Sequence, residues 1–159
     1  MLNVKSPIAI VKFGWAVTVY LVLSFILFLT TSFTMMGWII YLFLLLPIYS
    51  IILLGLCFFV WRNRSKSIQV KCWIWQIVLV LQLATIIVSP GNCYGFTQGD
   101  RCYSHLQILA GGAPNQGFSA TPIPHWKIVE DSFLGVTVAY GVALTIGIFS
   151  SSLVENEEF

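Results

Sequence analysis

Cys93 and Cys102 are the residues whose type and spacing point most directly to a defined chemistry in this chain of 159 residues. Eight residues separate them, which differs from the Cys-x-x-Cys spacing typical of activated redox thiols. In an oxidising compartment such a pair is expected to form a structural disulfide. Closing a ring of this size stabilises a fold by about 2–3 kcal/mol when chain entropy is counted.

The histidines are weaker candidates for chemistry. His105 and His125, together with Asp100, Glu130 or Asp131, could hold a metal ion, but their spacing matches no familiar ligand pattern. We therefore expect hydrogen-bonding histidines at the edge of a membrane, and we predict no metal site and no cofactor.

Gln76 and Gln82 are strongly polar residues within a long apolar stretch. Six positions separate them, which places them about 240° apart around a helix. We expect at least one of them to form an interhelical hydrogen bond, worth about 0.6–2 kcal/mol in a membrane. Lining a pore or binding a lipid headgroup is the alternative. Cys57 and Cys72, near the ends of apolar stretches, are expected to be small buried thiols.

Small residues recur at every fourth position near the C-terminus, at Gly135, Ala139, Ala143, Gly147 and Ser151. On a helix this small-residue ladder forms a shallow groove that lets another helix approach closely. Its partner is either another helix of the same chain or a separate subunit.

Membrane helices must position these residues. Residues 13–61 form a run of 49 residues without Asp, Glu, Lys, Arg or His. Charged residues make up 9% of the chain, whereas soluble domains carry about 25%. A single helix of that length would measure about 70 Å, more than twice the hydrocarbon thickness, so the run must fold back. The hydroxyl-rich stretch 30–37 is the expected break.

We predict an all-α integral membrane protein, one domain over residues 1–159, in which four transmembrane helices form an antiparallel bundle. The helices are expected at about 13–33, 38–61, 72–89 and 132–153. Pro47 should kink the second helix. The fourth should be preceded and capped by Glu130, Asp131 and Ser132.

The orientation follows from the distribution of Lys and Arg, which favour the cytoplasmic side. Arg101 and Lys127 lie on the side of the long loop at 90–131. The other side carries Lys5, Lys12, Arg62, Arg64, Lys66 and Lys71. Both termini are therefore predicted to be cytoplasmic, or to face the stroma or matrix of an organelle, and the loop to be extracytoplasmic or lumenal.

The loop at 90–131 is expected to be an ordered cap stapled by the predicted disulfide. Residues 103–110 could form a short helix that ends at Gly111 and Gly112. The segment 114–126 holds three prolines and should be irregular. We expect it to dock on the bundle through Phe118, Ile123 and Trp126.

The composition favours a function that depends on association rather than on catalysis. The chain has no phosphate-binding loop, no HExxH motif and no basic clustering typical of nucleic-acid binding. We expect a non-enzymatic accessory or assembly subunit of a larger membrane complex, with the lipid bilayer and other membrane subunits, or a second copy of itself, as partners. The alternatives are a homo-oligomeric channel or permeation protein, and a membrane redox or lipid-modifying enzyme that uses the outer cysteines or histidines.

Overall fold

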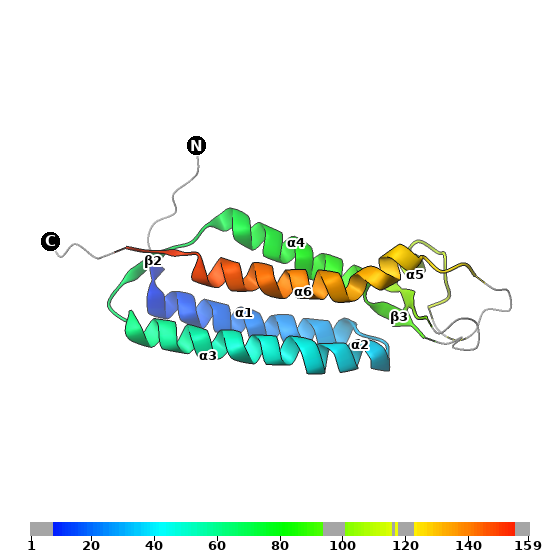
Figure 1. Cartoon of the computed structure of the whole chain (residues 1–159), viewed down its shortest axis with the longest axis horizontal. Coiled ribbons are helices and arrows are strands. Elements are labelled where there is room, and N and C mark those ends of the chain that lie inside the picture. The colour runs from blue at the N-terminus through cyan, green and yellow to red at the C-terminus, as the bar shows by residue number, and fades with distance from the viewer. Residues whose placement is uncertain (1–7, 94–100, 116, 118–122, 155–159) are drawn as a thin grey trace.

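The computed structural model describes residues 8–93, 101–115, 117 and 123–154, which are mostly helical (Figure 1). Three helical segments are long and apolar enough to cross a membrane: α1 (Ile10–Thr31), the run Met35–Arg62, and α6 (Lys127–Phe149). The apolar helix α4 (Cys72–Val88) is shorter, with 17 residues. The length and composition of these helices indicate a membrane protein, as the sequence predicts.

The predicted break after the first helix is confirmed. α1 ends at Thr31, and α2 (Met35–Ile40) begins after the extended residue Thr34. The Thr34 hydroxyl accepts a hydrogen bond from the backbone N–H of Gly37 at 3.2 Å. It thereby satisfies one of the free N–H groups that every helix leaves at its start.

A widened helical turn accommodates Pro47. α2 continues through a π-helical turn, η1 (Tyr41–Leu45), into α3 (Leu46–Arg62). The N–H of Leu46 bonds to the carbonyl of Tyr41, one residue farther back than in an α-helix. Proline has no N–H with which to complete the α-helical bond four residues back, so a local rearrangement is expected beside it.

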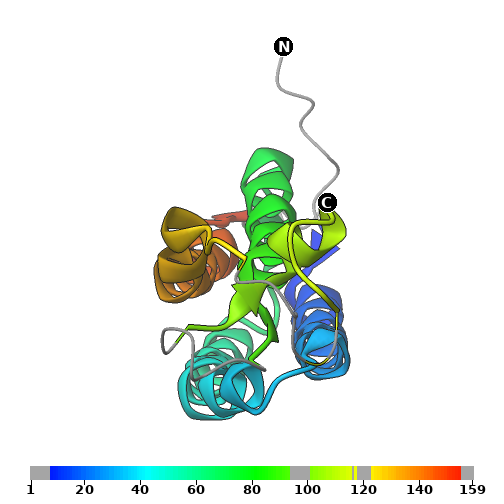
Figure 2. The same ribbon diagram turned by 90° about the vertical axis from the view of Figure 1, so that its right-hand side faces the viewer.

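The long helices form four rods: α1, the continuous run α2–η1–α3, α4 and α6. These rods lie side by side, as the end-on view in Figure 2 shows. α4 packs along α6, and α1 packs against α3. Side chains from all four rods meet inside, and the fully buried ones include Phe28, Tyr41, Leu45, Tyr140 and Leu144. In a bilayer such packing stabilises through van der Waals contact, because lipid tails are as apolar as the core.

The start of α6 differs from the prediction. The helix begins at Lys127, five residues before the expected start at 132, and its N-cap residue Trp126 makes no side-chain capping bond. Glu130 therefore lies in the first turn rather than before it, and Ser132 donates to the carbonyl of Val129. These residues therefore do not precede and cap the helix as predicted, but Glu130 does place a negative charge in the first turn, as expected for the positive end of a helix.

Short strands bring the first and last described segments together at one end of the molecule (Figure 1). β1 (Ile8–Ala9), β2 (Ser67–Gln69) and β5 (Ser152–Val154) form an antiparallel sheet with β2 in the middle. Ile68 is opposite Ile8 on one side and Leu153 on the other. This sheet joins the first and last described segments to the α3–α4 loop. These three regions, which were predicted to lie on the same side of the membrane, thus lie at the same end of the molecule.

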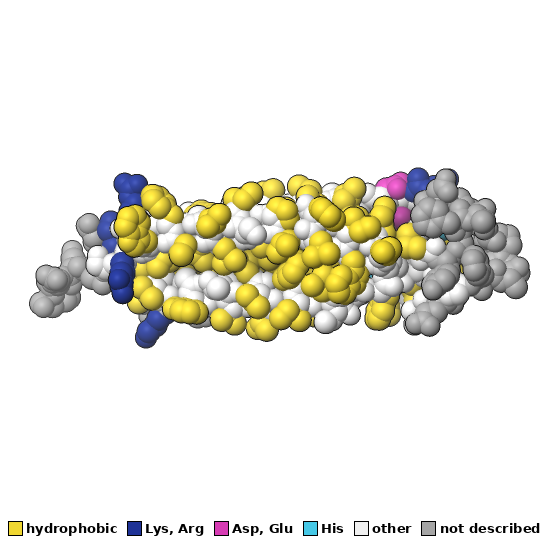
Figure 3. All heavy atoms as spheres, turned by 90° about the horizontal axis from the view of Figure 1, so that it is seen from below, with side chains coloured by type: hydrophobic (Ala, Val, Ile, Leu, Met, Phe, Trp, Pro, Cys, Tyr) yellow, Lys and Arg dark blue, Asp and Glu magenta, His cyan; other side chains and the backbone are white. Residues whose placement is uncertain are grey.

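The opposite end carries the cap, built from the strands β3 (Pro90–Asn92) and β4 (Tyr103–Ser104), the short helix α5 (His105–Leu109) and the segment that leads into α6. α5 confirms the short helix expected within 103–110. It ends before Gly111, whose φ of +73° favours glycine. Between the two ends, Figure 3 shows hydrophobic side chains over the face it presents.

Candidate functional site

A cluster of polar side chains lies inside the bundle, and every helical rod contributes to it. Tyr20 and Ser24 come from α1, Tyr49 from α3, Gln82 from α4 and Tyr140 from α6. Ser24, Tyr49, Gln82 and Tyr140 are buried, and Tyr20 is half-buried. We call these five residues the polar cluster.

Six short contacts join the members of the polar cluster. The Tyr20 hydroxyl donates to Gln82 Oε1 at 2.8 Å, and Gln82 Nε2 donates to Ser24 Oγ at 3.0 Å. The Tyr140 hydroxyl lies 2.7 Å from that of Tyr49, 3.0 Å from Ser24 Oγ and 3.1 Å from the Tyr20 hydroxyl. Ser24 Oγ lies 2.8 Å from the Tyr49 hydroxyl. Each member thus has partners within the cluster.

The hydroxyl protons are fewer than the contacts that need them. Tyr20, Ser24, Tyr49 and Tyr140 bring one hydroxyl proton each. Five contacts require such a proton, since the glutamine amide supplies the sixth. Four of these five contacts can therefore be hydrogen bonds at the same time. The two oxygens of the fifth contact then have no proton between them. The cluster consequently has more than one arrangement of protons with the same number of bonds.

The polar cluster consists of neutral groups that are surrounded by aromatic rings. Phe25 contacts Tyr49, Phe28 contacts Tyr140, and Trp75 contacts Tyr20, all in edge-to-face geometry. Hydroxyls and an amide that bond to one another cross-link helices without bringing a charge into the apolar interior. The arrangement is suited to fixing the relative position of the four rods.

The expected interhelical glutamine bond is confirmed at Gln82 and does not extend to Gln76, whose side chain is exposed on α4. The hydroxyl members of the cluster were not predicted from the sequence. One signal was available. Ser24 continues the buried stripe of Val17, Leu21 and Phe28 on α1, where a polar side chain needs a partner.

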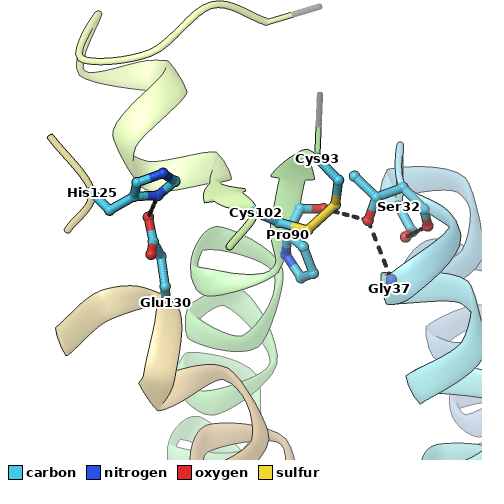
Figure 4. Close-up of a disulfide and its surroundings, with 8 residues drawn as sticks. Ser32, Gly37, Pro90, Cys93, Cys102, His125 and Glu130 are labelled. Atoms are coloured by element: carbon cyan, nitrogen blue, oxygen red, sulfur yellow. Dashed lines mark hydrogen bonds and ion pairs between the residues drawn. A yellow bond between two sulfur atoms is a disulfide. The ribbon is translucent and has the colours of Figure 1, made fainter. Parts of the chain in front are cut away.

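The second candidate region is the cap, where Cys93 and Cys102 form the predicted disulfide (Figure 4). Figure 4 places this disulfide near the turn between α1 and α2, with Pro90 facing Ser32 and Gly37. The Thr34 hydroxyl donates to the Pro90 carbonyl at 2.9 Å. One hydroxyl thus both caps α2 and ties it to the strand that leads to the disulfide.

A hollow of about 760 Å³ opens beside the disulfide. It lies between the α1–α2 turn and the cap, and its described lining carries no charged side chain: Phe33, Thr34, Met35, Gly91, Asn92, Cys93, Asn115 and Gly117.

Amide side chains link several segments within the described part of the cap. Gln107 is fully buried; its amide donates to the carbonyls of Gly112 and Pro124 at 3.2 and 2.8 Å. Gln107 Oε1 also accepts a hydrogen bond from the backbone N–H of Trp126 at 3.2 Å. Trp126 is 40% exposed, and its indole lies near Gly112 of the cap; its predicted docking on the bundle stays a prediction.

Of the other two predicted docking residues, Ile123 is half-buried and Phe118 lies outside the described residues. Asn92 Nδ2 makes a further link of the same kind, donating to the Pro114 carbonyl at 2.8 Å. Amide side chains thus supply several of the links among the described segments of the cap.

The two histidines occupy different places in the cap. His125 Nδ1 lies 2.9 Å from Glu130 Oε1 (Figure 4). The His125 ring also stacks on Tyr103, with centroids 4.2 Å apart. His105 packs against Phe33, and burial lowers its pKa more than a backbone contact with Thr31 raises it. This hydrogen-bonding use of His125 agrees with the prediction.

The charged residues near the histidines are divided among separate pairs. Asp131 pairs with Arg101, and Glu130 with His125. Asp100 lies outside the described residues. Within the part of the chain that the structure describes, no group of three His, Cys, Asp or Glu residues is placed to hold a metal ion.

The small-residue ladder on α6 divides into two halves. Gly147 is buried against Ile74 of α4, and a Cβ added there would lie 3.4 Å from that side chain. Gly135 and Ala139 are exposed, and no atom lies within 4 Å of a Cβ added at Gly135. Ala143 is half-buried between them. Ser151 is buried but lies beyond the end of α6, which stops at Phe149 rather than at the predicted 153. Only the C-terminal half is used for packing against α4, because a four-residue step advances about 40° around a helix.

Cys57 and Cys72 are free thiols with exposed side chains. Their predicted burial is wrong. α3 and α4 turn other side chains, such as Leu56 and Ile74, toward the interior.

No family model, curated protein or solved structure matches the chain.

Proposed function

We propose that the chain is a non-enzymatic membrane protein that acts by associating with other membrane-embedded chains, as an accessory or assembly subunit. The observation that carries this proposal is the outward-facing half of the small-residue ladder on α6. Gly135 and Ala139 are exposed, although the same ladder is used for internal packing at Gly147. A groove of this kind lets a second helix approach closely enough for backbone contact.

The polar cluster supports this proposal from inside the bundle. The polar groups of its five residues form hydrogen bonds with one another. Their groups are neutral, and they join all four rods. A core that is fixed in this way provides a rigid surface, and a rigid surface loses less entropy when a partner binds.

The topology that we propose has four spans, with both chain ends on the cytoplasmic, stromal or matrix side and the cap on the other. α4 has 17 residues, which extend to about 26 Å. That length falls a little short of the ~30 Å hydrocarbon core. Local thinning of the bilayer accommodates a mismatch of this size at modest cost.

A homo-oligomeric channel or permeation protein is the second candidate. The observation that favours it is Gln76, whose amide is exposed on the outer face of α4. A ring of such amides between protomers could line a polar path. The polar cluster does not support this function, because its groups lie within one protomer and bond to each other.

The experiment that separates the two candidates is the native mass of the gently solubilised complex, with its subunits identified. An assembly subunit is recovered with different chains, and a channel is recovered as a closed ring of identical chains. A complex that contains only a single copy would contradict both.

Paired variants connect this result to the groove. Replacing Gly135 and Ala139 with leucine should release the partner chains, because the side chains would fill the groove. The matched control is Ala16→Leu, which enlarges an exposed alanine on α1 instead. Equal loss of partners in both variants would remove the groove from the explanation.

A further inference from the structure

Basic side chains gather at the end of the molecule that carries the three-stranded sheet, opposite the cap (Figure 3). α1 contributes Lys12, α3 contributes Arg62, and the α3–α4 loop contributes Arg64, Lys66 and Lys71. We call these five residues the basic collar. Among the described residues the acidic side chains are Glu130 and Asp131, which lie at the cap end.

The basic collar surrounds the molecule rather than forming one pocket. α1 and α3 meet where a Cβ on Gly14 would lie 2.9 Å from Val60 Cγ2. Lys12 and Arg62 each lie two residues closer to the sheet end than these contact points. Two residues correspond to a rotation of about 200° around a helix, so the two cations point away from the α1–α3 contact. Both are exposed.

An exposed tryptophan accompanies the collar on each of three helices, always on the side of the apolar band. Trp15 follows Lys12 on α1, Trp61 precedes Arg62 on α3, and Trp73 follows Lys71 at the start of α4. The indoles are 69%, 76% and 53% exposed. Along the helix axes, each lies within about 5 Å of its cation. Indoles at headgroup level, with cations just beyond them, are typical of a membrane interface.

We propose that the basic collar and its three tryptophans bind the anionic phospholipid headgroups of one bilayer leaflet. A single soluble anion would need cations that converge on one point. The collar instead offers cations at one level on several outward faces, which fits a layer of negative charge around the protein. Each Lys or Arg near such a layer strengthens binding about fivefold. This inference does not depend on the proposed association with other chains.

Three glutamates, Glu155, Glu157 and Glu158, follow β5 in the sequence and lie outside the described residues. The five described cations of the collar outnumber these three carboxylates. Attraction to an anionic surface is therefore expected to remain, and to weaken as salt increases.

The test measures lipid retention by the full-length protein in neutral detergent, using native mass spectrometry with phosphatidylglycerol or phosphatidylcholine. Retention of several phosphatidylglycerol molecules and few phosphatidylcholine molecules is expected. The variant Lys12→Gln/Arg62→Gln/Lys71→Gln should bind phosphatidylglycerol at least tenfold more weakly. Lys127→Gln, which removes a cation at the cap end, is the matched control and should bind like the unaltered protein.

Equal retention of the two lipids, or unchanged binding by the triple variant, would overturn the proposal. So would inorganic phosphate that displaces phosphatidylglycerol, because the collar would then bind free phosphate. If the triple variant does not fold, as judged by helix content and the Cys93–Cys102 disulfide, the single variant Lys12→Gln should still lose about fivefold. The charge-conserving variant Lys12→Arg/Arg62→Lys/Lys71→Arg should retain the lipid.

Discussion

Replacing tyrosines of the polar cluster with phenylalanine tests whether hydroxyl protons or contacts determine its stability. Tyr→Phe removes a hydroxyl and keeps the ring, so the core stays filled. Tyr49 and Tyr140 are the informative pair, because their hydroxyls are 2.7 Å apart. Each also contacts Ser24.

The cost of each substitution follows from the proton count. The intact cluster makes four hydroxyl-donated bonds from five contacts. Without the Tyr49 hydroxyl, three protons serve three contacts, so one bond is lost. Without the Tyr140 hydroxyl, two contacts remain, so two bonds are lost and one proton has no acceptor. At about 1 kcal/mol per interhelical bond, Tyr49→Phe should cost about 1 kcal/mol and Tyr140→Phe about 2 kcal/mol.

The double variant gives the sharpest comparison. Without both hydroxyls, one hydroxyl-donated bond remains, between Tyr20 and Gln82. The loss is three bonds, which equals the sum of the single losses. The proton count therefore predicts additive costs, of about 3 kcal/mol in total, for two groups in direct contact. Counting every contact as a bond predicts instead that the double variant costs less than the sum by one bond.

The assay is the free energy of unfolding of the purified protein in mixed micelles, followed by helix content as denaturing detergent increases. A double-mutant cycle reports the coupling between the two hydroxyls. Coupling of about 1 kcal/mol, or a Tyr49→Phe cost equal to that of Tyr140→Phe, would refute the reasoning from protons.

Three further predictions concern the cap, the first turn and pH. Cys93→Ser should lower the free energy of unfolding by about 2–3 kcal/mol, and added reductant should have the same effect on the unaltered protein and none on the variant. Gly37→Ala should destabilise by about 1–3 kcal/mol, because the new Cβ would overlap the Ser32 hydroxyl, whereas Gly135→Ala, with open space around it, should be neutral or stabilising in thermal unfolding. Burial lowers the pKa of His105 from its ordinary value of 6.5, so the unfolded chain takes up this proton more readily and stability should fall as the pH decreases below that value. His105→Gln should remove this part of the pH dependence in unfolding measured across pH 5–8; an unchanged pH profile would contradict it.

The distribution of charge made much of the fold predictable from the sequence. The uncharged run 13–61 exceeds any single span, so it required a break, and the hydroxyl-rich residues around Thr34 form it. The cysteine pair predicted the disulfide because both cysteines fall in the loop expected in an oxidising compartment. Both features depend on local properties that a sequence displays directly.

The polar cluster could not be assembled from the sequence in the same way. Tyr20, Tyr49 and Tyr140 lie on three different helices, α1, α3 and α6. In the sequence of an apolar helix, a tyrosine resembles any other aromatic residue. Their hydroxyls become a site only when the helix rotations are known. Gln82 was recognised because a glutamine is unusual in such a segment.

The sheet and the start of α6 were missed for two further reasons. β1 and β5 have two and three residues, too few to show an alternating pattern. The residues around Glu130 resemble a loop by composition. In the structure these residues are helical, and their charges have partners: Glu130 pairs with His125, and Asp131 pairs with Arg101.

The most direct test of the account is a photo-crosslinking experiment on the outward half of the small-residue ladder, in the native membrane. A photoreactive side chain at Ala139 should attach the protein to another membrane chain, and the same group at Ala16 on α1 should not. Crosslinking to lipid alone at both positions would contradict a role in association.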